Sequence, residues 1–154
     1  MADFAYTYGL LAIGLGDVHW DTDDIRFIMC MTNTTADTER DKDFIGSFST
    51  LDEFDGGGSH PPAFAAREAL ANEALTVDTA NDRAEFDADN HTVSSLPAGT
   101  RDIQGIVVYW HSGSDAASIP LLWIDSGGFP FTANGGDLVL SWNAQGIAQI
   151  TSSG

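Results

Sequence analysis

The sequence predicts a mainly β protein, with an antiparallel β-sandwich or barrel-like fold and one or two short helices. Segments rich in β-branched, Leu and aromatic residues recur through the last third of the chain, at residues 103–110, 119–125 and 137–143. Gly, Ser, Asp, Asn and Pro fill the gaps between them. Short strands with turn residues in each gap are typical of sandwiches and barrels. The length of 154 residues fits a single β-rich domain, residues 1–154, with a buried core.

The N-terminal region is predicted to form an arm, residues 1–16, ahead of the first clear strand. Residues 4–15 are apolar and aromatic with interspersed glycines, a pattern that suits a short helix, a strand or an arm packed on a neighbour. Residues 21–24 have the polar composition of a turn. Residues 25–32 then alternate between one apolar face and one mixed face, which predicts a strand.

The middle of the chain is predicted to hold two flexible loops, at residues 33–43 and 55–62. The first is polar and charged, and the second combines a run of glycines with a pair of prolines. We interpret the second as a loop and not as a domain boundary, because the segment before it is too short to fold alone. Between the loops, Thr50-x-x-Glu53 fits a capping box and predicts a short helical turn.

Residues 63–74 present a conflict between local propensity and the wider pattern. Their Ala, Arg, Glu and Leu content favours a helix. A polar turn at residues 78–82 is nevertheless flanked by apolar residues as in a β-hairpin, namely Leu75, Val77, Ala84 and Phe86. We therefore expect extended or irregular backbone over residues 63–74 and a strand that begins near Leu75.

The last third is predicted to build the core. Residues 103–110 are apolar on both faces, which predicts a central strand, and residues 147–150 predict a last short strand. An aromatic loop, residues 129–131, lies between two pairs of glycines. The residues expected together in one core are Ile106, Val108, Leu122, Leu138 and Leu140.

The net charge of −17 limits the partners of the chain, since 23 acidic residues face only 6 Lys and Arg. Neutralisation of phosphates needs a basic face, so we expect no nucleic acid and no anionic membrane as partner. The excess acid is expected to keep the protein soluble, with patterned mimicry of DNA as the less favoured alternative. The sequence contains neither a long apolar run nor a basic N-terminal region, so we expect no transmembrane helix and no signal peptide.

Residue types that support catalysis or bind metals form no specific pattern. Cys30 lies in an apolar run, which predicts a buried free thiol. Acidic turns at residues 21–24 and 87–90 resemble fragments of calcium loops without the central Gly and distal Glu of an EF-hand, so a looser Ca²⁺ site is an alternative to solvated turns. The four histidines are far apart in sequence, at His19, His60, His91 and His111. We assign no catalytic residue, no metal site and no cofactor.

The order of strand and turn signatures resembles a set of small structural proteins of tailed bacteriophages, found in head and tail gene clusters. The resemblance covers residues 21–150 and is carried by motifs of moderate specificity. These motifs are Asp21-x-Asp23-x-Ile25-x-Phe27, Leu75-Thr-Val77-Asp with Asp82-x-Ala84-x-Phe86, Ile103-x-Gly105-x-Val107-Val-Tyr109, Pro120-Leu-Leu-x-x-Asp125 and Gly136-Asp-x-x-x-x-Trp142-x-x-x-Gly146-Ile147. The acidic residues 33–43 and the Gly-rich and Pro-rich break set this chain apart from that set.

The resemblance implies a non-enzymatic virion structural protein, synthesised in the host cytoplasm. We expect a capsid decoration or cement protein on the capsid exterior, with the major capsid protein and further copies of itself as partners. The resemblance implies a homo-oligomer, with a trimer as the expected state. The alternatives are a phage tail or host-adhesion component, and a carbohydrate-binding β-sandwich module. The last depends on whether Trp110, Trp123 and Trp142 form an exposed row or pack in the core.

Two segments are expected to contact these partners. Large apolar side chains at a chain end or a loop tip are usually covered by a binding partner. The expected interface residues are Phe4, Tyr6 and Tyr8 in the N-terminal segment and Phe129 and Phe131 in the aromatic loop. The alternative is that both segments fold back onto the core of their own chain.

Overall fold

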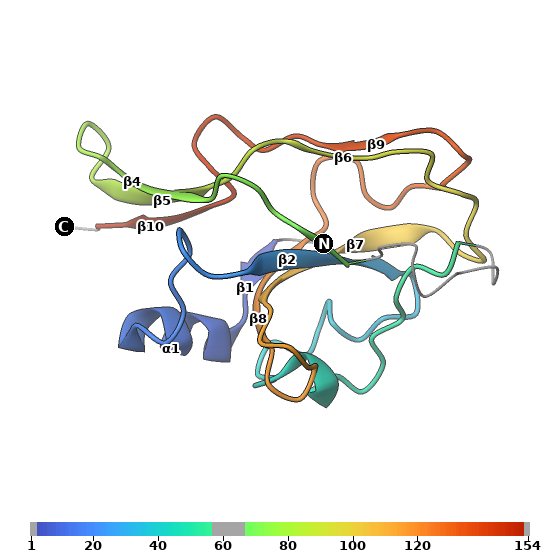
Figure 1. The fold of residues 1–154 in the computed structure, drawn as a ribbon, viewed down its shortest axis with the longest axis horizontal. Helices are drawn as coiled ribbons and strands as arrows, with labels where there is room; N and C mark the ends of the chain where they lie inside the picture. The colour runs from blue at the N-terminus through green and yellow to red at the C-terminus, as the bar shows by residue number, and fades with distance from the viewer. Residues whose placement is uncertain (1–2, 57–66, 153–154) are drawn as a thin grey trace.

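The computed structural model describes residues 3–56 and 67–152, which form antiparallel sheets arranged in two layers (Figure 1). The larger sheet is open and has five strands. Their order across the sheet is β1 (Phe4–Ala5), β8 (Ile119–Ile124), β7 (Ile103–Trp110), β2 (Ile25–Met31) and β3 (Arg67–Ala69). The mainly β prediction and the central position of residues 103–110 are confirmed, since β7 lies between β8 and β2 and is buried on both faces.

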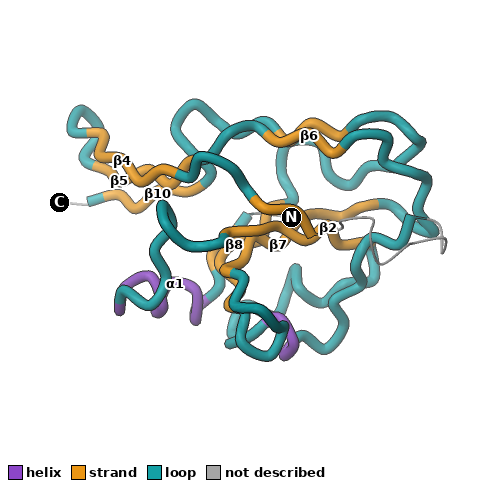
Figure 2. The backbone as a smooth tube through the Cα atoms, viewed as in Figure 1, coloured by secondary structure: helices purple, strands orange, loops and turns teal. Residues whose placement is uncertain are grey.

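Two smaller sheets form the second layer above the five-stranded sheet (Figure 1). One has the order β10 (Ala148–Thr151), β5 (Arg83–Asp87) and β4 (Ala74–Asp78), and the other pairs β6 (His91–Val93) with β9 (Leu138–Leu140). The predicted hairpin is confirmed, because β4 and β5 pair around the turn with Asp78 opposite Arg83. The arrangement is a β-sandwich with short strands and long connections (Figure 2).

The main core lies between the two layers. It joins the inner face of the five-stranded sheet to residues of both small sheets, and it contains the predicted core set. Ile106, Val108 and Leu140 are buried there, and Leu122 and Leu138 pack against them from partly buried positions. That prediction is therefore confirmed.

A second core covers the opposite face of the five-stranded sheet. Alternate residues of β2, Ile28 and Cys30, pack there beside Val107 and Tyr109 of β7. The 33–54 segment covers them through Ala36, Ile45 and Phe48, among others. The alternation of residues 25–32 thus marks a strand between two cores, and Cys30 is the predicted buried thiol. Burial raises the pKa of that thiol.

The segment between β2 and β3 differs from its prediction at one point. The helical turn predicted at Thr50–Glu53 is wrong, and a single 3₁₀ turn, η1 (Ile45–Ser47), lies earlier in the chain. The Phe54 N–H donates to the Met29 carbonyl at 2.8 Å, and Glu53 lies opposite Cys30 as in a sheet. Pairing with β2 therefore prevails over the local capping signal.

Residues 67–74 agree with the expectation of extended or irregular backbone, since β3 is followed by a bend before β4. Residues 63–66 of the same prediction lie outside the described residues, as does most of the predicted 55–62 loop. The predicted 33–43 loop is a series of turns. Within the described segments, the helices are all too short or too polar to cross a membrane.

Candidate functional site

The N-terminal helix α1 (Thr7–Leu15) is apolar all round but only partly covered. Its sequence, TYGLLAIGL, contains no charged residue. The buried residues are Gly9 and Ala12. Four large apolar side chains of the helix are 45–67% exposed, namely Tyr8, Leu10, Leu11 and Leu15. A helix that is hydrophobic on all sides is normally enclosed by protein, so α1 has the character of a contact element.

Close backbone contact fixes α1 against β8. A Cβ atom placed on Gly9 would lie 2.5 Å from the Pro120 carbonyl oxygen and 2.8 Å from the Leu121 Cα. Just before the helix, the Tyr6 N–H donates to the Leu121 carbonyl at 2.9 Å. The helix ends at Gly16, whose φ of 76° is the left-handed conformation that glycine favours at this position. The backbone of α1, from which the exposed side chains project, is therefore held in a fixed position against the sheet.

Two separate apolar surfaces flank the buried side of α1. Tyr8, Leu11 and Leu15 follow the i, i+3, i+7 spacing of one helix face, which we call the helix stripe. Leu10 and Ile13 lie toward the three-stranded sheet and line a small cavity of about 60 Å³ with residues of β5 and β10. We call the space between α1 and this sheet the α1 cleft.

The sheet that borders the α1 cleft has an entirely apolar inner face. The register places Val77, Ala84 and Ile150 in one row and Leu75, Phe86 and Ala148 in the next. Phe86 is buried against Trp20, with the two rings edge-to-face at 5.6 Å between centroids. The row of Val77, Ala84 and Ile150 extends beyond the main core, in the part of the sheet that lies above α1 (Figure 1). Val77 is 74% exposed. Sequence alternation at Leu75–Val77 and Ala84–Phe86 indicated the hairpin but not this overhang.

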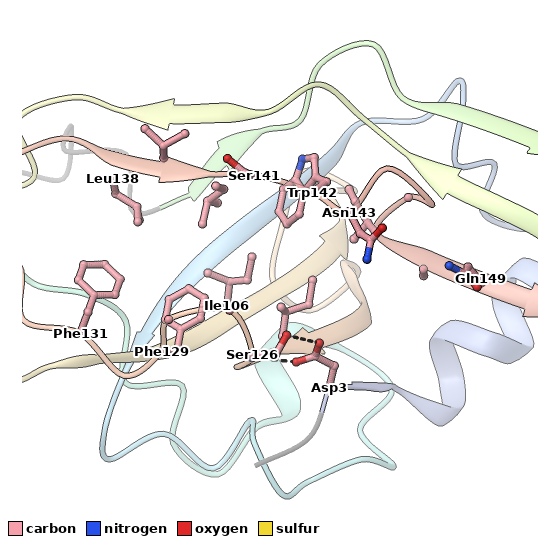
Figure 3. Close-up of a pocket in the computed structure, with 18 residues that line it drawn as sticks. Asp3, Ile106, Ser126, Phe129, Phe131, Leu138, Ser141, Trp142, Asn143 and Gln149 are labelled. Atoms are coloured by element: carbon pink, nitrogen blue, oxygen red, sulfur yellow. Dashed lines mark hydrogen bonds between the residues drawn. The ribbon is translucent and has the colours of Figure 1, made fainter.

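A third surface is a groove of about 730 Å³ that opens between the two layers (Figure 3). Phe129 and Phe131 line it with their ring centroids 5.6 Å apart, beside Ile106, Leu138 and Trp142. We call it the aromatic groove. The predicted interface residues Phe129 and Phe131 are thus half-buried in a cavity wall and do not project as a loop tip.

Hydrogen bonds hold the walls of the aromatic groove in place. The Trp142 indole N–H donates to the Asp89 carbonyl at 2.9 Å, and the Trp142 backbone N–H donates to Asn90 Oδ1 at 2.9 Å. At the opposite wall, the Asp3 carboxylate accepts from the backbone N–H groups of Asp125 and Ser126 at 2.9 and 3.0 Å. It also accepts from the Ser126 hydroxyl at 2.6 Å (Figure 3). These bonds fix the positions of Trp142 and Asp3 in the two walls of the groove.

The N-terminal aromatic residues have three different environments. Tyr6 is fully buried, and its hydroxyl donates to the Ala36 carbonyl at 2.6 Å. Phe4 is half-buried, edge-on to Tyr6 and 4.2 Å from the Arg40 guanidinium carbon. Tyr8 is exposed and belongs to the helix stripe. The expectation of a partner contact is therefore corrected for Tyr6, which completes the second core of its own chain, and retained for Tyr8.

Most of the few Lys and Arg residues in the described segments form ion pairs, namely Arg26, Lys42, Arg67, Arg83 and Arg101. Arg67 of β3 pairs with both Glu53 and Asp115, and these contacts hold the pKa of Asp115 below its usual range. Carboxylates of the two acidic turns also have partners within the chain. Asp24 forms an ion pair with Arg26 at 2.6 Å, and the Asp89 carboxylate accepts a hydrogen bond from the Asn72 amide at 2.6 Å. Among the described residues, His, Cys, Asp and Glu form no group of three that could hold a metal ion. His60 lies outside them.

The tryptophans do not form a flat exposed row. Trp123 is completely buried in the second core, and Trp110 and Trp142 are half-buried beside the main core. The indoles pack in or beside the two cores, which does not support the alternative of a sugar-binding platform made by all three.

Comparisons with protein-family models, with curated proteins and with solved structures found no match.

Proposed function

We propose that the chain is a non-enzymatic structural protein of a phage particle, a decoration protein that binds the outer face of the shell formed by the major capsid protein. The observation that carries the proposal is the helix stripe, Tyr8, Leu11 and Leu15, on a helix without charged residues. A stripe of this kind on a chain with a net charge of −17 fits burial against another protein. The kind of partner comes from the resemblance of the strand and turn motifs to those of phage structural proteins.

The rigid attachment of α1 to β8 supports this role. The backbone contact at Gly9 means that the stripe is presented by the folded domain itself, without a disorder-to-order transition. A preorganised backbone loses little conformational entropy on binding. Many copies bound to one shell would then stabilise it by mass action, since each copy binds only the assembled state.

A tail or host-adhesion component is the alternative within the particle. Both roles use the same stripe, and they differ in the particle part that the stripe covers. The trimeric state of the free protein remains an expectation from the resemblance, to be measured by light scattering. The excess negative charge of each copy opposes self-association at low salt.

The test is a binding experiment with phage heads and tails purified from a strain that lacks the gene. The parent chain is expected to sediment with heads, and Leu11→Ser should weaken that binding by at least about tenfold because one apolar anchor is lost. Val139→Ser is the matched control, since Val139 is 55% exposed against 53% for Leu11 and lies in β9, away from α1.

Circular dichroism should show that both serine variants keep the parent fold, because each replaces an exposed side chain. Equal binding of the parent and the two variants would contradict a role for the helix stripe. Sedimentation with tails alone would replace the head decoration role with the tail alternative.

A further inference from the structure

We propose that the aromatic groove is a binding site for a neutral saccharide. The groove lies between the ends of the two layers, and its lining comes from four separate parts of the chain, near residues 3, 106, 124–131 and 138–149. The inference is independent of the proposed shell contact, which uses α1. It rests on the size of the groove, its mixed lining and the hydrogen-bonding groups that remain available in it.

The size and shape of the aromatic groove suit a ligand of one or a few sugar rings. Ligand pockets typically enclose about 300–1,000 Å³, and the groove encloses about 730 Å³. Trp142 and Asn143 point into it from the upper layer, and Ile106 points into it from the five-stranded sheet (Figure 3).

The aromatic side chains supply the apolar half of saccharide recognition. A pyranose has an apolar C–H face that packs on aromatic rings and a rim of hydroxyl groups that form hydrogen bonds. Phe129, Phe131 and Trp142 are all half-buried and line the groove. The indole of Trp142 is fixed by its bond to the Asp89 carbonyl, so stacking on it requires no rearrangement.

Amide and hydroxyl groups supply the polar half. Asn143 Oδ1 accepts from the Gln145 N–H at 3.1 Å, which leaves the Asn143 Nδ2 group available among the described residues. Gln149 Nε2 donates to the Gln145 carbonyl at 3.2 Å, which leaves Gln149 Oε1 available as an acceptor. The Ser141 hydroxyl also lines the groove. A donor, an acceptor and a hydroxyl that serves as both match the hydroxyl rim of a sugar.

Electrostatics favour a neutral sugar over an anionic one. Among the described residues that line the groove, the only ionisable side chain is that of Asp3, which is acidic, and the whole chain carries a net charge of −17. A sialic or uronic acid would meet repulsion from both. A lipid or fatty acid would contact the apolar wall but make no use of the exposed amides of Asn143 and Gln149, to which the hydroxyl groups of a sugar can bind.

The test is nuclear magnetic resonance titration of the full chain with a panel of neutral mono- and disaccharides built from glucose, galactose and N-acetylglucosamine. At least one sugar is expected to shift the side-chain amide resonances of Asn143 and Gln149. Sialic acid should shift them less at the same concentration. Failure of the whole neutral panel to shift these amides, or tighter binding of sialic acid, would overturn the proposal.

Two asparagines provide a matched pair of variants for the same titration. Asn143→Asp should weaken the binding of the active sugar by about tenfold, because the variant loses the Nδ2 donor but keeps the Oδ1 acceptor. Asn134→Asp adds the same charge in the same kind of turn, where Asn134 Oδ1 accepts from the Gly136 N–H at 3.1 Å, but it lies outside the groove lining. Equal losses in the two variants would overturn the proposal.

Tryptophan fluorescence offers a second readout that does not depend on the amides. The change in emission on addition of the active sugar should disappear in Trp142→Phe and persist in Trp110→Phe, since Trp110 does not line the groove. The opposite pattern would place the sugar elsewhere and overturn the proposal.

Discussion

Two glycines of helix α1 provide a matched pair of substitutions with opposite expected effects on stability. Gly9 touches the backbone of β8, because an added Cβ would lie 2.5 Å from the Pro120 carbonyl oxygen and 2.8 Å from the Leu121 Cα. Gly14 lies in the same helix with nothing within 4 Å of the corresponding position. Alanine at either position gains about 0.5–1 kcal/mol from helix propensity. Only at Gly9 must the helix also move away from the sheet.

The magnitudes follow from these contacts. Overpacking costs about 1–3 kcal/mol, and the atoms met at Gly9 are backbone atoms of a central sheet, which yield little. Gly9→Ala should therefore lower the free energy of unfolding by about 1–2 kcal/mol net. Gly14→Ala should raise it by about 0.5–1 kcal/mol. Urea unfolding monitored by circular dichroism measures both, with an unchanged slope expected for each. Stabilisation by Gly9→Ala equal to that by Gly14→Ala would refute the close packing of α1 on β8.

Two further predictions concern the second core and the loop that covers it. Burial raises the pKa of Glu39, but bonds from Ser49 and Thr35 outweigh this and lower it to about 2, from 4.5. Glu39→Gln should lower the free energy of unfolding at neutral pH by about 1 kcal/mol, a value reduced for screening by solvent. Its urea midpoint should converge with that of the parent as the pH falls from 4.5 to 2. Cys30 should resist a thiol reagent until the chain unfolds, because it is fully buried. Rapid labelling of the native protein would contradict that burial.

The strands were predictable where the residue pattern matches the burial of each face. Residues 25–32 and 103–110 are such cases, because each strand contacts two cores and carries apolar residues for both. The hairpin around residues 78–82 was predictable from its turn and its flanking alternation. The helical turn predicted at Thr50–Glu53 was wrong because the capping signal describes only neighbouring residues. The segment instead pairs with β2, whose residues lie more than twenty positions away in the sequence.

The candidate sites were less accessible to sequence reasoning, for a physical reason. Tyr6 and Tyr8 are two residues apart, yet one completes a core and the other is exposed, because the start of α1 separates their directions. Phe129 and Trp142 line one groove although they lie thirteen positions apart in different segments of the chain. Composition identifies such aromatic residues as candidates, but only the packing of the layers decides which of them share a surface.

An electron cryomicroscopy reconstruction of phage particles that carry the chain tests the central claim, that the helix stripe contacts the capsid shell, most directly. The claim predicts copies of the domain on the outer face of the head, with Tyr8, Leu11 and Leu15 buried against the major capsid protein. Domains bound to the shell with these three side chains facing solvent, or particles without the chain, would contradict it.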